Sequence, residues 1–210
     1  MLISSSHFQA SLANHTSPRT RGFTLIELLV VIAIMAIITT ILLLRQQQFD
    51  SSILLRSLAY SAALSIRQAQ TYGVSVQGES ASGSTVFASA YGAYFSSGTP
   101  TSYFLFADTN SSGQYDSGDK IVQTFTLGPG YTITNFCAGS QCSSNRTITS
   151  LTVIFSRPNP DACFATNLDS GACVPGEYSS ASIQFSSQGG STRSVTISPT
   201  GEIAVGIVGS

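Results

Sequence analysis

The sequence predicts an α+β protein in which one long N-terminal α-helix, membrane-spanning in its first half, packs on an antiparallel β-sheet domain. Three observations support this fold class. An apolar run covers Phe23–Leu44, and Glu27 is its only charged residue. A helical period of small and apolar residues continues from that run to Gly73. From Val74 onward, short β-branched and aromatic stretches alternate with Gly, Ser, Asn and Pro, as in sheets with short connections.

The apolar run is long enough to cross a membrane. Its twenty-two residues would span roughly 30 Å as a helix, the thickness of a bilayer's hydrocarbon core. The run is too long for a secretory signal, and Arg45-Gln46-Gln47-Gln48 follows it in place of a small-residue cleavage site. A carboxylate such as Glu27 costs about 2.5–3.5 kcal/mol at mid-membrane and less near an interface. We therefore expect a partner for its charge.

The second half of the helix is amphipathic. One face repeats at intervals of three and four residues, and it consists of Leu55, Leu58, Ala59, Ala62, Ile66 and Ala69. No proline occurs between Phe23 and Thr99, and Gly73 is a plausible C-terminal stop. These features predict one continuous helix of about fifty residues, about 75 Å long.

The remainder of the chain predicts strands that pack on the amphipathic half of the helix. The expected strands are Thr85–Phe87, Tyr91–Phe95, Tyr103–Ala107, Ile121–Leu127, Tyr131–Phe136, Leu151–Phe155, Ser182–Phe185, Ser194–Ile197 and Glu202–Val208. The segment Gly78–Ser84 is expected to be a flexible loop, and the stretch from Pro158 to Gly176 an irregular, exposed one.

Four segments follow from these patterns. They are a leader at 1–22, a membrane segment at 23–44, an amphipathic half-helix at 45–73 and a β-rich domain at 74–210. The leader is polar and carries two arginines next to the apolar run, so it is expected in the cytoplasm, with the C-terminal domain on the outer side.

Composition argues against an enzyme and against a nucleic-acid binder. Without the leader the chain has seven basic and ten acidic side chains, a net charge of −3, no histidine and one lysine, Lys120. The usual general bases and activated nucleophiles are therefore missing, and no phosphate-binding glycine motif is present. The domain is also not basic enough to indicate a nucleic-acid partner.

The start of the apolar run, Gly22-Phe23-Thr24-Leu25-Ile26-Glu27, resembles the processing site of type IV pilins and type II secretion pseudopilins. The resemblance implies that prepilin peptidase cuts after Gly22 and that Phe23 becomes N-methylphenylalanine. It also implies that Glu27 neutralises the N-terminal amine of a neighbouring subunit during assembly in the inner membrane. The energy of extrusion would then come from a separate cytoplasmic ATPase. The alternative is an ordinary single-span anchor that carries an accidental glutamate.

Residues 57–70 and 193–203 are similar to the GspH/FimT-type minor pseudopilins and minor pilins. Relatives often end in a Gly-Arg turn, whereas this chain has Gly201-Glu202. Because the T-type members that bind DNA use arginines in that tail, the substitution counts against a role in DNA uptake. The resemblance leaves secretion, pilus and competence systems open.

The segment from Asp108 to Asp119 has the spacing of a twelve-residue calcium loop, with glycine at position 6. The candidate ligands are Asp108, Asn110, Ser112, Gln114, Asp116 and Asp119, of which Gln114 would contribute its backbone carbonyl. Ser112 and Asp119 depart from the usual ligand types, and strands rather than helices are expected on both sides. The other interpretation is a polar hairpin whose Asp, Asn and Gly residues favour turns. Any calcium would be structural.

Four cysteines, Cys137, Cys142, Cys163 and Cys173, fall in two sequence-local pairs. If the domain faces outward, this pattern suggests the disulfides Cys137–Cys142 and Cys163–Cys173, although three connectivities are formally possible. A Cys₄ zinc site is the rival, but the gaps are not those of C-x-x-C pairs. Free thiols in a reducing host are the other alternative. The segment around the second pair could contact a partner or simply be a stapled loop.

Overall fold

The structure, a computed structural model, describes residues 22–75, 78–81, 84–87, 90–145 and 148–207. For residues 44–50, 78–81 and 84–87 it describes the backbone alone. Most of the expected leader therefore lies outside the described residues, as does the last residue of the expected strand Glu202–Val208. The chain divides into two compact units with their boundary between Leu44 and Arg45.

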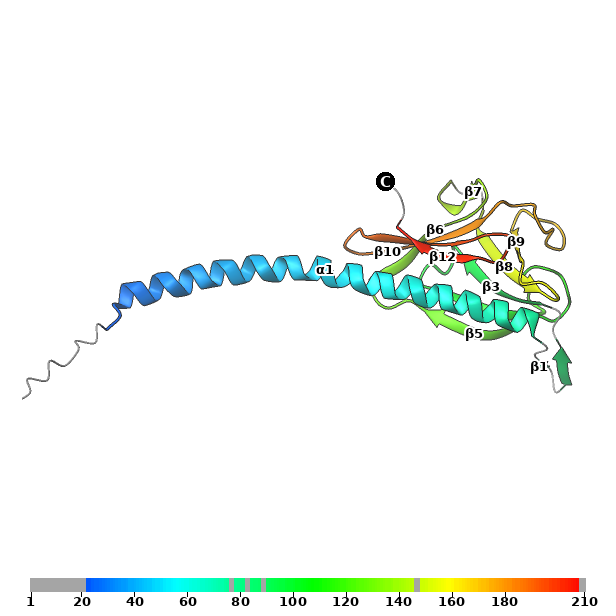
Figure 1. The fold of residues 1–210 in the computed structure, drawn as a ribbon, viewed down its shortest axis with the longest axis horizontal. Helices are drawn as coiled ribbons and strands as arrows, with labels where there is room; N and C mark the ends of the chain where they lie inside the picture. The colour runs from blue at the N-terminus through cyan, green and yellow to red at the C-terminus, as the bar shows by residue number, and fades with distance from the viewer. Residues whose placement is uncertain (1–21, 76–77, 82–83, 88–89, 146–147, 208–210) are drawn as a thin grey trace, which may run out of the picture. The chain divides into compact units, whose positions relative to one another are not determined.

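The helix α1 runs from Leu25 to Val74, 50 residues without a break (Figure 1). Its start is set by Thr24, whose Oγ1 accepts a hydrogen bond from the Glu27 backbone N–H at 3.3 Å. This is an N-cap, which satisfies one of the otherwise unpaired N–H groups of the first turn. The prediction of a single helix of this length is confirmed.

The end of the helix differs in detail from the prediction. Gly73 was expected to stop the helix, but α1 continues to Val74 and Gly73 is not among the residues with positive φ. A Cβ at Gly73 would collide with the backbone carbonyl and Cβ of Phe155. The glycine is therefore required for close approach between α1 and the neighbouring strand, not for a left-handed helix cap.

The β domain contains two five-stranded antiparallel sheets and a separate hairpin. In spatial order, the first sheet consists of β12 (Ile203–Gly206), β11 (Thr192–Ile197), β10 (Ala181–Ser187), β6 (Tyr131–Ala138) and β7 (Gln141–Cys142). The second consists of β5 (Lys120–Thr126), β4 (Ser102–Asp108), β3 (Ala90–Ser96), β8 (Ser150–Ser156) and β9 (Ala162–Thr166). The strands β1 (Gly78–Ala81) and β2 (Ser84–Phe87) form the hairpin, and a short 3₁₀ turn covers Ser143–Asn145. The predicted α+β class with a C-terminal sheet domain is confirmed.

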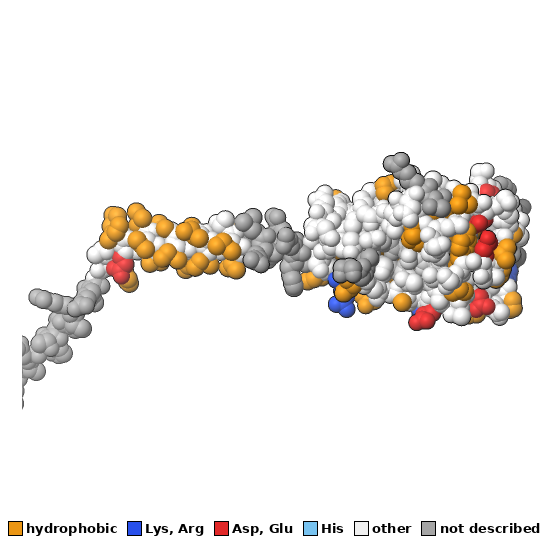
Figure 2. Space-filling model, turned by 90° about the horizontal axis from the view of Figure 1, so that it is seen from above, with side chains coloured by type: hydrophobic (Ala, Val, Ile, Leu, Met, Phe, Trp, Pro, Cys, Tyr) orange, Lys and Arg blue, Asp and Glu red, His pale blue; other side chains and the backbone are white. Residues whose placement is uncertain are grey.

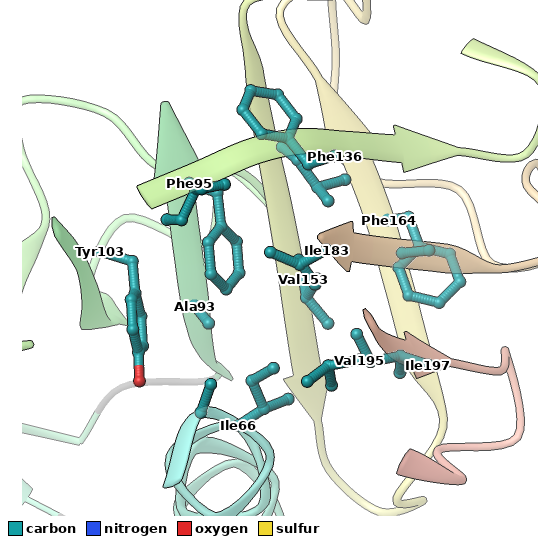
Figure 3. Close-up of a cluster of buried hydrophobic side chains, with 14 of the residues drawn as sticks. Ile66, Ala93, Phe95, Tyr103, Phe136, Val153, Phe164, Ile183, Val195 and Ile197 are labelled. Carbon is teal, nitrogen blue, oxygen red and sulfur yellow. The ribbon is translucent and has the colours of Figure 1, made fainter. Parts of the chain in front are cut away.

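The core lies between the two sheets and the second half of α1 (Figure 3). The helix contributes its predicted face, on which Leu55, Ala59, Ala62, Ile66 and Ala69 are buried and Leu58 is half-buried. Ile66 points toward Val153, Ile183 and Val195, which come from both sheets. The strand residues that face inward alternate with residues on the opposite face, as the period of two requires.

The outer face of the second sheet has an aromatic cover of its own. Tyr94, Phe104 and Phe106 point away from the main core, and Tyr115 from the β4–β5 loop packs on them with ring centroids 4.7–5.3 Å apart. Aromatic side chains therefore cover the outer face of these strands, while the inner face packs on the main core.

Three strands were not predicted, and two of them correct specific expectations. The segment Gly78–Ser84, expected to be a flexible loop, contains β1, which pairs with β2 from Gly78↔Phe87 to Ala81↔Ser84. The segment from Pro158 to Gly176, expected to be irregular, contains β9, which pairs with β8. The short strand β7 pairs with the end of β6. All three strands are short, and their backbone pairing with a neighbour outweighs weak local propensity.

Candidate functional site

The expected cleavage site lies in an exposed, non-helical segment directly before α1. Gly22, Phe23 and Thr24 carry no helical structure, and the Phe23 side chain is 84% exposed. Among the described residues, and apart from its chain neighbours, no atom lies within 4 Å of the position that a Cβ on Gly22 would take. A peptidase needs access to the backbone, and the Gly22–Phe23 bond joins two exposed, non-helical residues.

Glu27 lies in the first turn of α1, where its charge suits the helix. The first turn of a helix carries unpaired N–H groups and the positive end of the dipole, which favour a carboxylate. The Glu27 side chain is exposed, and no residue of 22–43 is basic. A positive partner for this carboxylate must therefore come from outside the described part of its own unit.

The first part of α1 has the properties of a membrane span. Leu25–Leu43 has a mean hydropathy of 2.8 and buries none of its side chains within the protein. Figure 2 shows apolar side chains along this segment and one acidic group near its start. The two hydroxyls of the span are satisfied internally, because Thr39 Oγ1 donates to the Met35 carbonyl at 2.7 Å and Thr40 Oγ1 to the Ala36 carbonyl at 2.8 Å. This helix is compatible with single-pass anchoring.

The start of this helix is also the part of the chain that matches a known protein family. Residues 17–43 match the family described as the prokaryotic N-terminal methylation motif. No curated protein and no solved structure matches the chain significantly. The match supports a relation to the type IV pilin-like prepilins, and it coincides with the residues that carry the processing and assembly hypotheses. The likeness to GspH/FimT-type subunits stays a prediction.

The candidate calcium loop connects β4 to β5, and its backbone folds around its own carboxylates. Asp108, the last residue of β4, is 2% exposed; its Oδ1 accepts from the Ser112 N–H and its Oδ2 from the Gly113 N–H, both at 3.0 Å. Asp119 Oδ1 accepts from the Thr109 N–H at 3.1 Å and its Oδ2 from the Asp116 N–H at 2.9 Å. Backbone N–H groups thus partly compensate both charges.

Asp116 is the third carboxylate of this loop, and it too accepts hydrogen bonds within the loop. Its Oδ2 accepts from Asn110 Nδ2 at 2.7 Å and its Oδ1 from the Gly118 N–H at 2.7 Å. These hydrogen bonds, that from Asn110 first, lower the pKa of Asp116, whereas burial raises the pKa of Asp119. The two other expected ligands face the same turn, because Ser112 Oγ donates to the Gln114 carbonyl at 2.8 Å.

Within the part of the chain that the structure describes, no three His, Cys, Asp or Glu side chains converge as a metal site. The carboxylates instead take backbone N–H groups as partners, an arrangement that also suits a plain polar hairpin. Calcium binding at this loop therefore stays a prediction.

Both expected disulfides form. Cys137–Cys142 links the paired strands β6 and β7, and Cys163–Cys173 links β9 to the loop after it, with Cα atoms 6.0 Å apart. The second disulfide lies against the candidate calcium loop, because a Cβ on Gly113 would lie 2.7 Å from the Cys173 nitrogen. Gly113 has a φ of +75°, so it meets both a conformational and a packing requirement.

The sequence reasoning missed two features of possible functional interest. The N-cap Thr24 could have been found, because Thr followed three residues later by Glu is the pattern of a capping box. The second feature is a basic groove lined by Arg56, Tyr60 and Arg193, which lie far apart in the sequence. No sequence signal joins these residues, and only the packing of α1 against β11 and β12 brings them together.

Proposed function

We propose that this chain is a structural subunit of a type II secretion or type IV pilus-like filament, and specifically a minor pseudopilin or pilin-like protein. Prepilin peptidase removes the leader after Gly22, and the new N-terminus is methylated on Phe23. The mature protein is held in the inner membrane by Leu25–Leu43, with its β domain on the outer side.

One observation carries this proposal. The methylation-motif match at 17–43 coincides with an exposed Gly22–Phe23 bond, an apolar helix that begins at Leu25 and an acidic side chain in its first turn. A carboxylate in an apolar span needs a positive partner. Cleavage after Gly22 creates an ammonium group, and the ammonium of a neighbouring subunit is the partner that the assembly mechanism supplies. If the helix were an ordinary membrane anchor, neither the exposed Gly22–Phe23 bond nor the Glu27 carboxylate would have a function.

The test is the N-terminus of the protein isolated from its native membrane. We expect mass spectrometry to find a peptide that begins with N-methylated Phe23. A Gly22→Glu variant should stay uncleaved, because a long side chain then flanks the scissile bond, whereas Thr20→Ala should be processed normally. Recovery of an intact leader from membranes that contain active prepilin peptidase would refute the processing part of the proposal.

A DNA-binding minor pilin is the runner-up. Arginines clustered on one edge of the β domain would favour it, and two of the seven basic side chains of the mature chain do share a groove. Each neutralised phosphate contributes to affinity for nucleic acid, and two contacts on a mature chain of net charge −3 provide little. A DNA-binding role is therefore less well supported than a structural one.

A further inference from the structure

We propose that the groove between α1 and the strands β11 and β12 binds an acidic, extended segment of a partner protein. The groove, here called the arginine groove, is lined by Arg56, Tyr60, Arg193, Val205, Gly206 and Ile207. It is a hollow of about 230 Å³ on the surface of the β domain. This inference concerns a binding surface, and it does not depend on leader processing.

The first argument is uncompensated charge. Arg56 and Arg193 line the same hollow, and no ion pair joins either of them to a carboxylate among the described residues. Two guanidinium groups in one groove repel each other, and an anion between them removes that repulsion. The rest of the mature chain is acidic overall, so this groove is a local exception to the charge of the domain.

The second argument is that both arginines are held in place before any ligand arrives. The Arg56 guanidinium lies over the Tyr60 ring, 5.7 Å from its centroid, as in a cation–π pair. Arg193 Nη1 donates to the Thr192 carbonyl at 3.0 Å, and its side chain is half-buried. A preorganised guanidinium loses less conformational entropy on binding. Its planar fork then matches the two oxygens of a carboxylate.

The third argument identifies the partner as a polypeptide strand. In the described chain β12 is the last strand of its sheet, and no strand pairs with its outer edge. An unpaired edge offers backbone N–H and C=O groups to an added strand. Val205 and the 73% exposed Ile207 add apolar surface beside the arginines. A strand that carries one carboxylate would therefore find backbone, apolar and charged partners together.

The experiment uses the mature full-length protein in detergent micelles and two blocked hexapeptides. Both peptides alternate threonine and valine; one carries a central glutamate and the other a glutamine in its place. We expect the glutamate peptide to bind about tenfold more tightly, because charge-assisted hydrogen bonds are about twice as strong as neutral ones. Its affinity should fall as salt rises, since exposed charges are screened. Equal affinities of the two peptides would refute the proposal.

Variants locate the site. Arg56→Gln and Arg193→Gln should each reduce the affinity for the glutamate peptide about tenfold or more. Arg67→Gln, an exposed arginine on the same helix outside the groove, should leave it within about twofold. Thermal melts of all three variants exclude a folding defect as the cause. A charge reversal, Arg193→Glu, should reject the glutamate peptide and accept one with a central lysine. Equal losses for Arg67→Gln and the groove variants would show non-specific charge attraction and overturn the site.

Two further probes decide how the ligand binds. Two versions of the glutamate peptide are N-methylated at alternate backbone amides, one at the odd and one at the even positions. If the peptide pairs with β12, binding of only one of these two versions should be weakened. No effect in either version would overturn the strand-addition part. Single-stranded oligothymidylate of similar length is the competing probe. If it bound more tightly than the glutamate peptide and lost that binding in Arg56→Gln, the groove would be a phosphate site and the proposal would fail.

Discussion

Gly73 is buried where the last turn of α1 passes the backbone of Phe155. Glycine within a helix usually costs roughly 0.5–1 kcal/mol relative to alanine. At position 73 we expect alanine, not glycine, to be the destabilising residue, because a Cβ would collide with the Phe155 carbonyl. Gly73→Ala should lower the free energy of unfolding by about 1–3 kcal/mol, the usual cost of overpacking. Chemical denaturation followed by circular dichroism measures it.

The matched control for Gly73→Ala is Thr71→Ala on the exposed side of the same turn. The Thr71 hydroxyl donates a hydrogen bond to the Arg67 carbonyl of the same helix. Its loss should change the free energy of unfolding by no more than about 0.5 kcal/mol. If Gly73→Ala stabilised the protein instead, α1 would not be held as close to β8 as the structure has it.

Tyr103 connects the helix to the sheet and gives the fold a dependence on alkaline pH. Its hydroxyl shares a 2.9 Å hydrogen bond with Ser65 Oγ, and burial raises the pKa of Tyr103 from 10.0 to about 12. The unfolded chain loses this proton near pH 10, whereas the folded chain keeps it up to about pH 12. The folded state therefore loses stability as pH rises between these values.

We expect the midpoint of thermal unfolding to fall across that pH window. Tyr103→Phe should flatten the fall and, at neutral pH, cost about 1 kcal/mol for the lost hydrogen bond. Tyr60→Phe, on the exposed side of the helix, serves as the control. The ultraviolet absorbance of tyrosinate in the folded protein provides an independent readout, and ionisation of Tyr103 at its ordinary pKa would contradict this prediction.

Among the elements, the segment from Asp108 at the end of β4 to Asp119 before β5 carries three carboxylates. If calcium binds there, it supplies the positive charge that allows Asp108, Asp116 and Asp119 to lie close together. Binding to the folded form alone would stabilise it by about 2.7 kcal/mol at a hundredfold excess over the dissociation constant. Thermal melts of the mature chain in detergent, with calcium and then with chelator, should differ by several degrees.

Asp108→Ala should abolish that difference. Glu202→Ala is the control, because it removes an exposed acid from the β11–β12 turn, outside the loop. Identical melts in millimolar calcium and in chelator would establish the loop as a plain hairpin held by its own backbone N–H groups.

The elements with a strong local pattern were predictable, and those formed by pairing alone were not. The face from Leu55 to Ala69 was readable, because a helix repeats its contacts along the sequence. Each of the nine predicted strands overlaps an observed one. By contrast, β9 lies among prolines and a disulfide, which hide its strand pattern, and β1 has the sequence Gly-Glu-Ser-Ala, which has low intrinsic strand propensity. Their structure depends on the strand beside them.

The candidate sites also differ in whether the sequence alone could reveal them. The processing segment from Gly22 to Glu27 is contiguous, so the sequence displays it whole. The arginine groove joins α1 to β11 and β12, and its residues become neighbours only after the helix packs against the first sheet. A single sequence contains no signal for such a convergence.

At the scale of the whole molecule, the proposed contact of Glu27 with a neighbouring subunit can be tested by substitution. Glu27→Ala should leave cleavage and membrane insertion intact or slightly favour insertion, since it removes a costly carboxylate. It should nevertheless reduce entry into filaments, because the ammonium of a neighbouring subunit loses its counter-charge. Co-purification with sheared filaments measures this, and Thr39→Ala in the same span is the control. Wild-type incorporation of Glu27→Ala would exclude this residue as the assembly contact.

The boundary between Leu44 and Arg45 also bears on how such a chain could evolve. The first buried side chain that the structure describes on α1 is Leu55, and every helix residue of the core follows it. Recombination that joined a foreign apolar segment at this boundary would therefore pass on every helix residue that the structure describes as buried, whereas a crossover after Ala59 would mix two cores. We therefore expect the sheet domain and its half-helix to be inherited together, with the apolar segment ahead of them exchanged separately.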